Sequence, residues 1–190
     1  MRRSTTRGLV LLLVLQVAVA AFGALTAVAA TNTTFQFSRS SNLSSTLTLF
    51  RRDTATGQVY NSATWRAGSG DSTNECIVGH GWLPAGSYDI RLHSDYYGGS
   101  KIQGRVWYLS DKRCSGGSGN LRTELFIHSE ETSSQGQSCG AGDLPFCWEG
   151  SHDYYSAGCI KLNHYGDLPS ADTDWHGWGG TTGANKLYVA

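Results

Sequence analysis

The chain has 190 residues, with 15 lysines and arginines against 15 aspartates and glutamates, so it lacks the basic excess that nucleic-acid binding needs. It contains 24 glycines, only 3 prolines and 21 aromatic residues, a composition that suits short strands and many turns better than a helical bundle. We therefore expect a mainly-β protein with little helix and no nucleic-acid partner.

The first 29 residues have the layout of a secretory signal. Three arginines precede a long uncharged apolar run, which ends in the small-residue triplet at 27–29. We predict a signal peptide at 1–29, although the apolar run is long enough to remain as an N-terminal membrane anchor. The protein would then be secreted or held at the cell envelope, outside the cytoplasmic membrane, with membrane contact only if the leader is uncleaved. The remaining 161 residues have the size of one ordinary domain.

Polar, low-complexity sequence fills 30–45, which we interpret as a tether ahead of a single domain at 46–190. Five segments of that domain have strand-like patterns: 46–52, 58–68, 86–93, 101–110 and 121–129. The first two suggest a hairpin. In the third, alternation places Tyr88, Ile90 and Leu92 on one face, and in the last it places Phe126 and His128 together.

No segment before Cys159 shows the 3.6-residue apolar period of a convincing helix. After it, 159–168 could form one or two helical turns, but we expect Gly166 and Pro169 to end them early.

All five cysteines lie in the part predicted to be exported, where disulfides form. Cys139 and Cys147 flank a short Gly-rich loop and suggest a local bridge. Cys76 and Cys114 each lie beside turn-like sequence and could join two neighbouring segments. An odd number leaves at least one cysteine without a partner in the chain, and this pairing makes it Cys159, although spacing alone does not prove it.

The small residues before Cys159 allow a substrate to approach it closely. A thiol attacks carbonyls as the thiolate, so a catalytic cysteine needs a base, and His128 at the end of a strand-like run is the candidate. Gly158 can adopt strained backbone angles, backbone N–H groups near Cys159 could bind an oxyanion, and Ser156 could donate into the same site. The simpler alternative is a buried cysteine acting as a small hydrophobe and a surface histidine.

A zinc site is a further alternative for this stretch. Five possible ligands fall within 26 residues: Cys139, Cys147, His152, Cys159 and His164. The stretch has neither the C-x-x-C nor the H-E-x-x-H spacing that zinc sites usually show. We therefore predict no metal site and no cofactor.

Two motifs resemble the L,D-transpeptidases of the YkuD type. The segment "FIHSE" at 126–130 resembles the family's strand ending in Ile-His-Gly or Ile-His-Ser. The segment "SAGCIKL" at 156–162 resembles its Ser-His-Gly-Cys, followed by an apolar residue and Arg or Asn. Upstream, "GWLPAGSYDI" at 81–90 is similar to its Pro-Thr-Gly-x-Tyr-x-Ile segment. The resemblance runs from about residue 47 to 162 and implies an L,D-transpeptidase-like β-sandwich catalytic domain.

The resemblance also implies a role for each matching residue. Cys159 would be the nucleophile and His128 its general base, oriented by the backbone carbonyl of Ser129. Ser156 and Gly158 would shape the nucleophile loop, and the amides of Gly158 and Cys159 would bind the oxyanion.

The chain departs from the family pattern at two positions. Ala157 occupies the place of the family's second histidine, and His152 is the nearest candidate to replace it. Lys161 stands where the family has Arg or Asn, and so keeps a cation without the planar fork of arginine. We assign substrate binding to four residues: His152, Tyr154, Tyr155 and Lys161.

The function implied is cell-wall biogenesis by a secreted, monomeric enzyme. It would join donor and acceptor stem peptides of peptidoglycan in 3–3 cross-links through a cysteine thioester. Two alternatives stay open. The same dyad could serve an L,D-carboxypeptidase, a wall-peptide hydrolase or a toxin-like effector, with water as acceptor in place of a stem amine. Or the domain could be a catalytically inactive wall-binding module, with Ala157 marking the lost activity.

Overall fold

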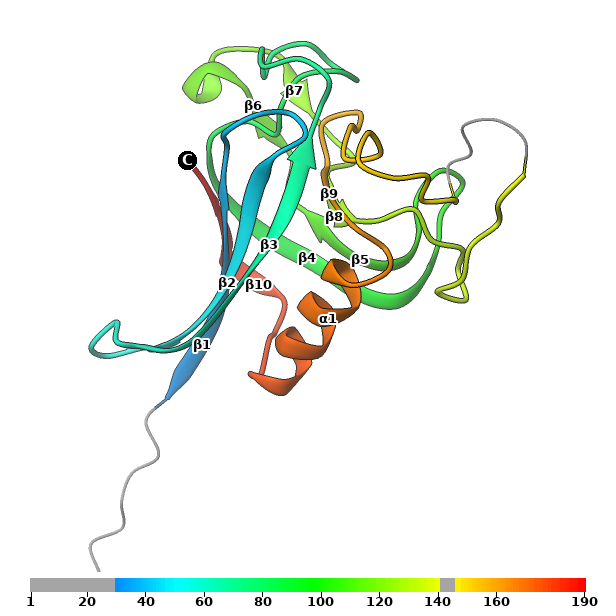
Figure 1. The fold of residues 1–190 in the computed structure, drawn as a ribbon. Coiled ribbons are helices and arrows are strands. Elements are labelled where there is room, and N and C mark those ends of the chain that lie inside the picture. Colours follow the sequence, from blue (N-terminus) through cyan, green and yellow to red (C-terminus); the bar gives the residue numbers. More distant parts are fainter. Residues whose placement is uncertain (1–29, 141–145) are drawn as a thin grey trace, which may run out of the picture.

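The chain forms a mainly-β fold in which eight strands close into a barrel (Figure 1). The computed structural model describes residues 30–140 and 146–190, so the predicted leader at 1–29 lies outside the described residues. Within that described part, no helix is both long and apolar enough to cross a membrane. The mainly-β prediction is confirmed, whereas the expected β-sandwich is not, because the strands close on one another.

The barrel order is β1-β10-β4-β5-β8-β9-β3-β2. Its strands are β1 (Thr31–Ser38), β2 (Ser45–Asp53), β3 (Val59–Ser69), β4 (Gly86–Gly98), β5 (Gln103–Leu109), β8 (Phe126–His128), β9 (Ile160–Leu162) and β10 (Gly183–Val189). The short strands β6 (Lys112–Arg113) and β7 (Leu121–Arg122) form a separate two-stranded sheet, the 3-10 turn η1 spans Ser115–Gly117, and the helix α1 spans Asp167–Gly177. In the barrel β1 is parallel to β10 and β8 is parallel to β9, whereas the other neighbours are antiparallel.

The strand predictions are confirmed in all five segments. The first four correspond to β2, β3, β4 and β5, the expected β2–β3 hairpin is present, and 121–129 contains both β7 and β8. One predicted face is wrong in part. Tyr88 and Ile90 are buried, but Leu92 is 40% exposed, because the β4–β5 register shifts between Ile90 and Leu92.

The interpretation of 30–45 as a tether is wrong. Residues 31–38 form β1, which pairs along its length with β2 and also with β10, so the domain begins well before residue 46. The local signal was the alternation around Phe35 and Phe37, whose side chains are fully buried. Because most of the surrounding residues are polar, this short apolar alternation was not recognised as a strand.

The helix expectation is also wrong in position. Residues 160–162 form β9, and α1 begins only after Gly166. Pro169 lies in the first helical turn, where the N–H that proline lacks has no intrahelical partner, so it does not end the helix. Packing holds α1 in place, since Leu168, Ala171 and Trp175 are buried in the main core and the Trp175 ring stacks on Phe35 at 5.3 Å.

Alternation along the strands creates apolar contacts on both faces of the sheet. Trp107 and Ile127 point into the main core inside the barrel. Val106, Phe126 and Cys159 form a second small cluster on the other face, together with aromatic and aliphatic neighbours from β4 and β5. This second face carries the candidate functional site.

Both predicted disulfides are confirmed. Cys76 is bonded to Cys114 and Cys139 to Cys147, while Cys159 is a buried free thiol. Two disulfides are consistent with an oxidising, extracellular environment.

Replacing Phe35 with alanine tests whether β1 belongs to the core. We expect a loss of about 3–5 kcal/mol in the free energy of unfolding, because the change removes a fully buried ring that contacts Trp107 and Trp175. Tyr188→Ala, on the neighbouring strand and 46% exposed, should cost less than about 1 kcal/mol. Denaturant unfolding measures both values. Equal losses would contradict the place of β1 in the barrel.

Candidate functional site

Strand pairing brings His128 and Cys159 to the same face of the sheet. Strands β8 and β9 are adjacent and parallel, with Ile127 opposite Ile160 and His128 opposite Lys161. Side chains alternate between the two faces of a strand, so His128 and Lys161 lie opposite the face that carries the two isoleucines. Cys159 immediately precedes β9, two residues before Lys161, and it packs in the outer cluster with Phe126.

A cavity of about 600 Å³ opens over this face. Its walls come from the β4–β5 connection, from β8, from the 122–124 segment and from the loop before β9. The lining combines aromatic side chains with both signs of charge, and it includes His128, Cys159, Ser156, Ala157 and Lys161. The lining is therefore neither uniformly apolar nor of a single charge.

His128 is held as a neutral base. Its Nδ1 lies 2.8 Å from the carbonyl oxygen of Ser129, as the resemblance implies. A carbonyl only accepts, so Nδ1 carries the hydrogen and Nε2 keeps a lone pair. Burial, aided by the positive charge of Lys161, lowers the pKa of His128 to about 4. At neutral pH the ring is therefore uncharged, with Nε2 unprotonated, and it is a weaker base than an exposed imidazole.

Cys159 is held as a neutral thiol. It is 5% exposed, and its Sγ donates to the carbonyl oxygen of Glu124 at 3.5 Å. Burial raises the pKa of Cys159 to about 11, against the opposing effects of the Phe126 backbone N–H, Arg122 and Lys161. Glu124 has the unusual φ of +53° for a non-glycine residue, so its backbone is strained beside the sulfur. The dyad therefore rests as thiol and imidazole, without a preformed thiolate.

Ser156 organises the loop that carries Cys159. Its Oγ accepts hydrogen bonds from the backbone N–H of Gly70 at 2.9 Å and of Gly158 at 3.1 Å, and it donates to the Cys159 carbonyl at 2.7 Å. The hydroxyl is used inside the loop, so the expectation that it donates into the site is not met. The backbone N–H of Gly158 donates to the Ser156 hydroxyl and is not free to bind an oxyanion. Of the two expected oxyanion donors, this leaves the backbone N–H of Cys159.

Arg122 lies directly behind this loop and is 2% exposed. Its Nη1 donates to the carbonyls of Glu75 at 2.7 Å and Trp82 at 3.3 Å, and its Nη2 to those of Gly81 at 3.2 Å and Ala157 at 3.0 Å. Arg122 was not among the site residues predicted from the sequence. A signal was present, because Arg122 precedes Phe126 and His128 at even spacing in the strand-like run.

Gly158 is required by this arrangement. Its φ is +106°, and a Cβ there would lie 1.9 Å from Nη2 of Arg122. Any other residue would both strain the backbone and displace the guanidinium.

Lys161 forms a buried ion pair with Glu130, and both side chains line the cavity. Burial raises the pKa of Glu130 to about 6, although Lys161 opposes this shift. The second carboxylate oxygen, Oε2, is buried and has no hydrogen-bond partner among the described residues. Lys161 was predicted to bind substrate and does lie in the cavity, but Glu130 engages its ammonium. Glu130 was not among the site residues predicted from the sequence.

The other three residues predicted to bind substrate do not line this cavity. Tyr154 is buried, with its ring edge-on to Trp148 at 4.9 Å and beneath the Arg66 guanidinium. His152 is 65% exposed beside Asp153, and Tyr155 is 43% exposed. The turn at 151–154 carries His152 away from the cavity, so this histidine does not replace the one that Ala157 lacks.

Comparisons with models of known protein families, with curated protein sequences and with solved structures find no match.

The resting state of Cys159 can be tested by alkylation with iodoacetamide. Because its pKa is raised to about 11, we expect the second-order rate constant to rise about tenfold per pH unit between pH 7 and pH 9. Mass spectrometry of the folded protein over this pH range measures the rate, and the chain unfolded in guanidinium should react faster at pH 7. A high rate that is flat from pH 5 to pH 8 would indicate a preformed thiolate and contradict the neutral dyad.

A glycine pair tests the contact between the nucleophile loop and Arg122. Gly117 has a φ of +107°, matching that of Gly158, but a Cβ there meets no atom within 4 Å. Gly117→Ala should therefore cost only the backbone strain, about 1–3 kcal/mol. Gly158→Ala should destabilise the protein by at least about 2 kcal/mol more, because the added Cβ displaces the Arg122 guanidinium and breaks its hydrogen bonds to backbone carbonyls. Denaturant unfolding compares the two, and equal losses would rule out the clash.

Proposed function

We propose that this protein is a secreted cysteine acyl-transfer enzyme that acts on peptidoglycan stem peptides, an L,D-transpeptidase forming 3–3 cross-links. The observation that carries the proposal is the pairing of β8 with β9. It brings a free thiol and a neutral imidazole to one face of the sheet, beside a single cavity. The motif resemblance supplies the substrate class.

In the acylation step, Nε2 of His128 takes the proton from Cys159 as the sulfur attacks the carbonyl carbon of the third stem residue. That residue is a diaminopimelate centre in the family that the motifs resemble. The C–S bond forms, the carbonyl oxygen becomes an oxyanion near the Cys159 amide, and the C–N bond to terminal D-Ala breaks. His128 returns its proton to the leaving amine, so the enzyme holds a thioester and an uncharged imidazole.

In the second step an amine of another stem peptide attacks the thioester carbonyl. His128 takes a proton from this amine, the C–S bond breaks and the thiol of Cys159 is restored. Water in place of the amine would give a carboxypeptidase or a wall-peptide hydrolase. Because the thiol rests uncharged, proton transfer to His128 must accompany the attack, and exclusion of water by the bound substrate would favour it.

Charges around the cavity support a zwitterionic stem centre as the substrate. Lys101 lines the cavity and would attract a carboxylate. The unpartnered Oε2 of Glu130 could accept a hydrogen bond from a substrate ammonium group. Since the pKa of Glu130 is raised to about 6, this acceptor is ionised above that pH and is lost as the pH falls below it.

The proposal is tested by incubating the exported domain with a disaccharide tetrapeptide that contains diaminopimelate. We expect release of D-Ala and a dimer with a 3–3 linkage, both detected by liquid chromatography and mass spectrometry. A carbapenem, which acylates the family that the motifs resemble, should leave one adduct on Cys159. Cys159→Ala should abolish turnover without unfolding the domain, and His128→Gln should lower it by at least about a hundredfold.

His152→Gln is the matched control for His128→Gln, because His152 is exposed outside the cavity and should leave turnover unchanged. Release of D-Ala without a dimer would identify water as the acceptor and a hydrolase or effector. Retention on insoluble wall, with no turnover and no adduct on the free thiol, would indicate the inactive wall-binding module. Turnover that persists in Cys159→Ala would overturn the cysteine mechanism.

A further inference from the structure

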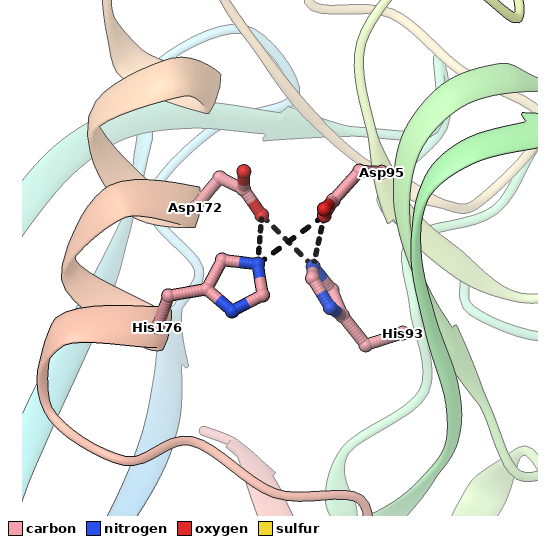
Figure 2. A group of neighbouring side chains, drawn as sticks. All are labelled: His93, Asp95, Asp172 and His176. Carbon is pink, nitrogen blue, oxygen red and sulfur yellow. Dashed lines mark hydrogen bonds and ion pairs between the residues drawn. The ribbon is translucent and has the colours of Figure 1, made fainter.

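We propose that His93, Asp95, Asp172 and His176 bind a zinc ion that clamps helix α1 to strand β4. Figure 2 shows the four side chains pointing toward one another, two from β4 and two from α1. The inference stands apart from the proposed acyl transfer. The His93 ring packs on Trp107 and Trp175 of the main core, whereas Cys159 belongs to the cluster on the other face of β5.

The four nitrogen–oxygen distances within the group are close to those between the ligands of a tetrahedral metal ion. His93 Nε2 lies 2.9 Å from Asp172 Oδ1 and 3.6 Å from Asp95 Oδ1. His176 Nε2 lies 3.3 Å from the same Asp95 oxygen and 3.7 Å from that of Asp172. A zinc ion with bonds of about 2.0–2.1 Å to nitrogen and oxygen separates its ligand atoms by about 3.3–3.4 Å. The four observed distances fall on both sides of that value.

Two carboxylates and two imidazole nitrogens meet at this place without a lysine or arginine from the described part of the chain. Two carboxylates converge within 4.8 Å of the same pair of imidazole nitrogens, and the side chains of Asp172 and His93 are only 14% and 10% exposed. Among the described residues, no lysine or arginine forms an ion pair with either carboxylate. A divalent ion would offset the charge of the two carboxylates.

The four ligands stand on two rigid elements. Asp172 and His176 are four residues apart on α1 and so lie on one side of the helix, while His93 and Asp95 are two residues apart on β4. The buried side chain of Trp175 fixes the helix against the barrel. The side chains of Asp95 and His176 are 36% and 54% exposed, so an ion can enter from that side.

The donor set favours zinc. Two imidazole nitrogens and two carboxylate oxygens are borderline and hard ligands, and zinc accepts both in a four-coordinate tetrahedral site. All four ligands come from the protein, which is the pattern of a structural ion. No metal site was predicted from the sequence, and the zinc alternative for the 139–164 stretch involved other residues. Because α1 was not predicted, the Asp-x-x-x-His spacing of Asp172 and His176 was not recognised.

The test uses the whole exported domain after removal of metal with a chelator. Isothermal titration with zinc chloride should show one ion per chain. The melting temperature should rise by about 5–10 °C at zinc concentrations near 100 times the dissociation constant. Cobalt bound at the same site should give the absorption spectrum of a tetrahedral complex.

Asp172→Asn and His176→Gln should each weaken zinc binding at least tenfold and remove most of the thermal shift. Asp174→Asn, on the same helix, is the matched control and should bind like the parent. His152→Gln is a second control, since Glu149, His152 and Asp153 form another possible metal-binding group. Because His176 is 54% exposed, its replacement should leave the fold intact, which circular dichroism checks.

Absence of zinc binding in the parent, or unchanged binding in both ligand variants, would overturn the inference. So would binding that disappears only with His152→Gln. The reaction of Cys159 with a carbapenem should persist in all these variants, so failure of the zinc proposal and failure of the acyl-transfer proposal would be observed separately.

Discussion

The buried guanidinium of Arg122 connects the segments that form the candidate site. It comes from β7 and donates hydrogen bonds to carbonyls of two loops, one at 75–82 and one that includes Ala157. A buried cation is tolerated only where such acceptors satisfy it, so each loop is held by the need to solvate the charge. This arrangement also requires glycine at position 158, because a side chain there would displace the guanidinium. The disulfide at Cys76 ties the first loop to the segment around Cys114 and reinforces the same arrangement.

Desolvation sets the chemistry of the dyad. The same burial that raises the pKa of Cys159 lowers that of His128, so both groups rest uncharged at neutral pH. The positive charges of Arg122 and Lys161 lower the pKa of the Cys159 thiol, against the effect of burial, and would stabilise a thiolate as it forms. A neutral thiol in an oxidising environment is less reactive toward oxidants than a thiolate, which is consistent with a free cysteine beside two disulfides. In the proposed acyl transfer, deprotonation of the thiol would then have to accompany attack on the substrate.

The two faces of the sheet carry two separate groups of polar residues. Strand β5 separates them, with Trp107 toward the helix and Val106 toward the cavity. Helix α1 contributes to the core through Trp175 and to the histidine–aspartate group through its adjoining polar side, so packing the helix also assembles that group. Strands β8 and β9 are only three residues long, so few backbone hydrogen bonds hold this part of the barrel. Hydrogen bonds of Ser156 and Arg122 join the loops at this place.

The sequence by itself determined the features that depend on neighbours along the chain. Alternation identified the strands, cysteine spacing predicted both disulfides and the free Cys159, and the end of a strand-like run singled out His128. Only the tertiary structure decided how these parts meet. The closure of the barrel through β1, the neutral state of the dyad and the partners of Arg122 all depend on segments distant in sequence. The physical reason is that periodicity predicts which face of a segment is apolar but not which other segment packs against that face. Desolvation and charge pairing depend on this packing, so they cannot be predicted from the segment alone.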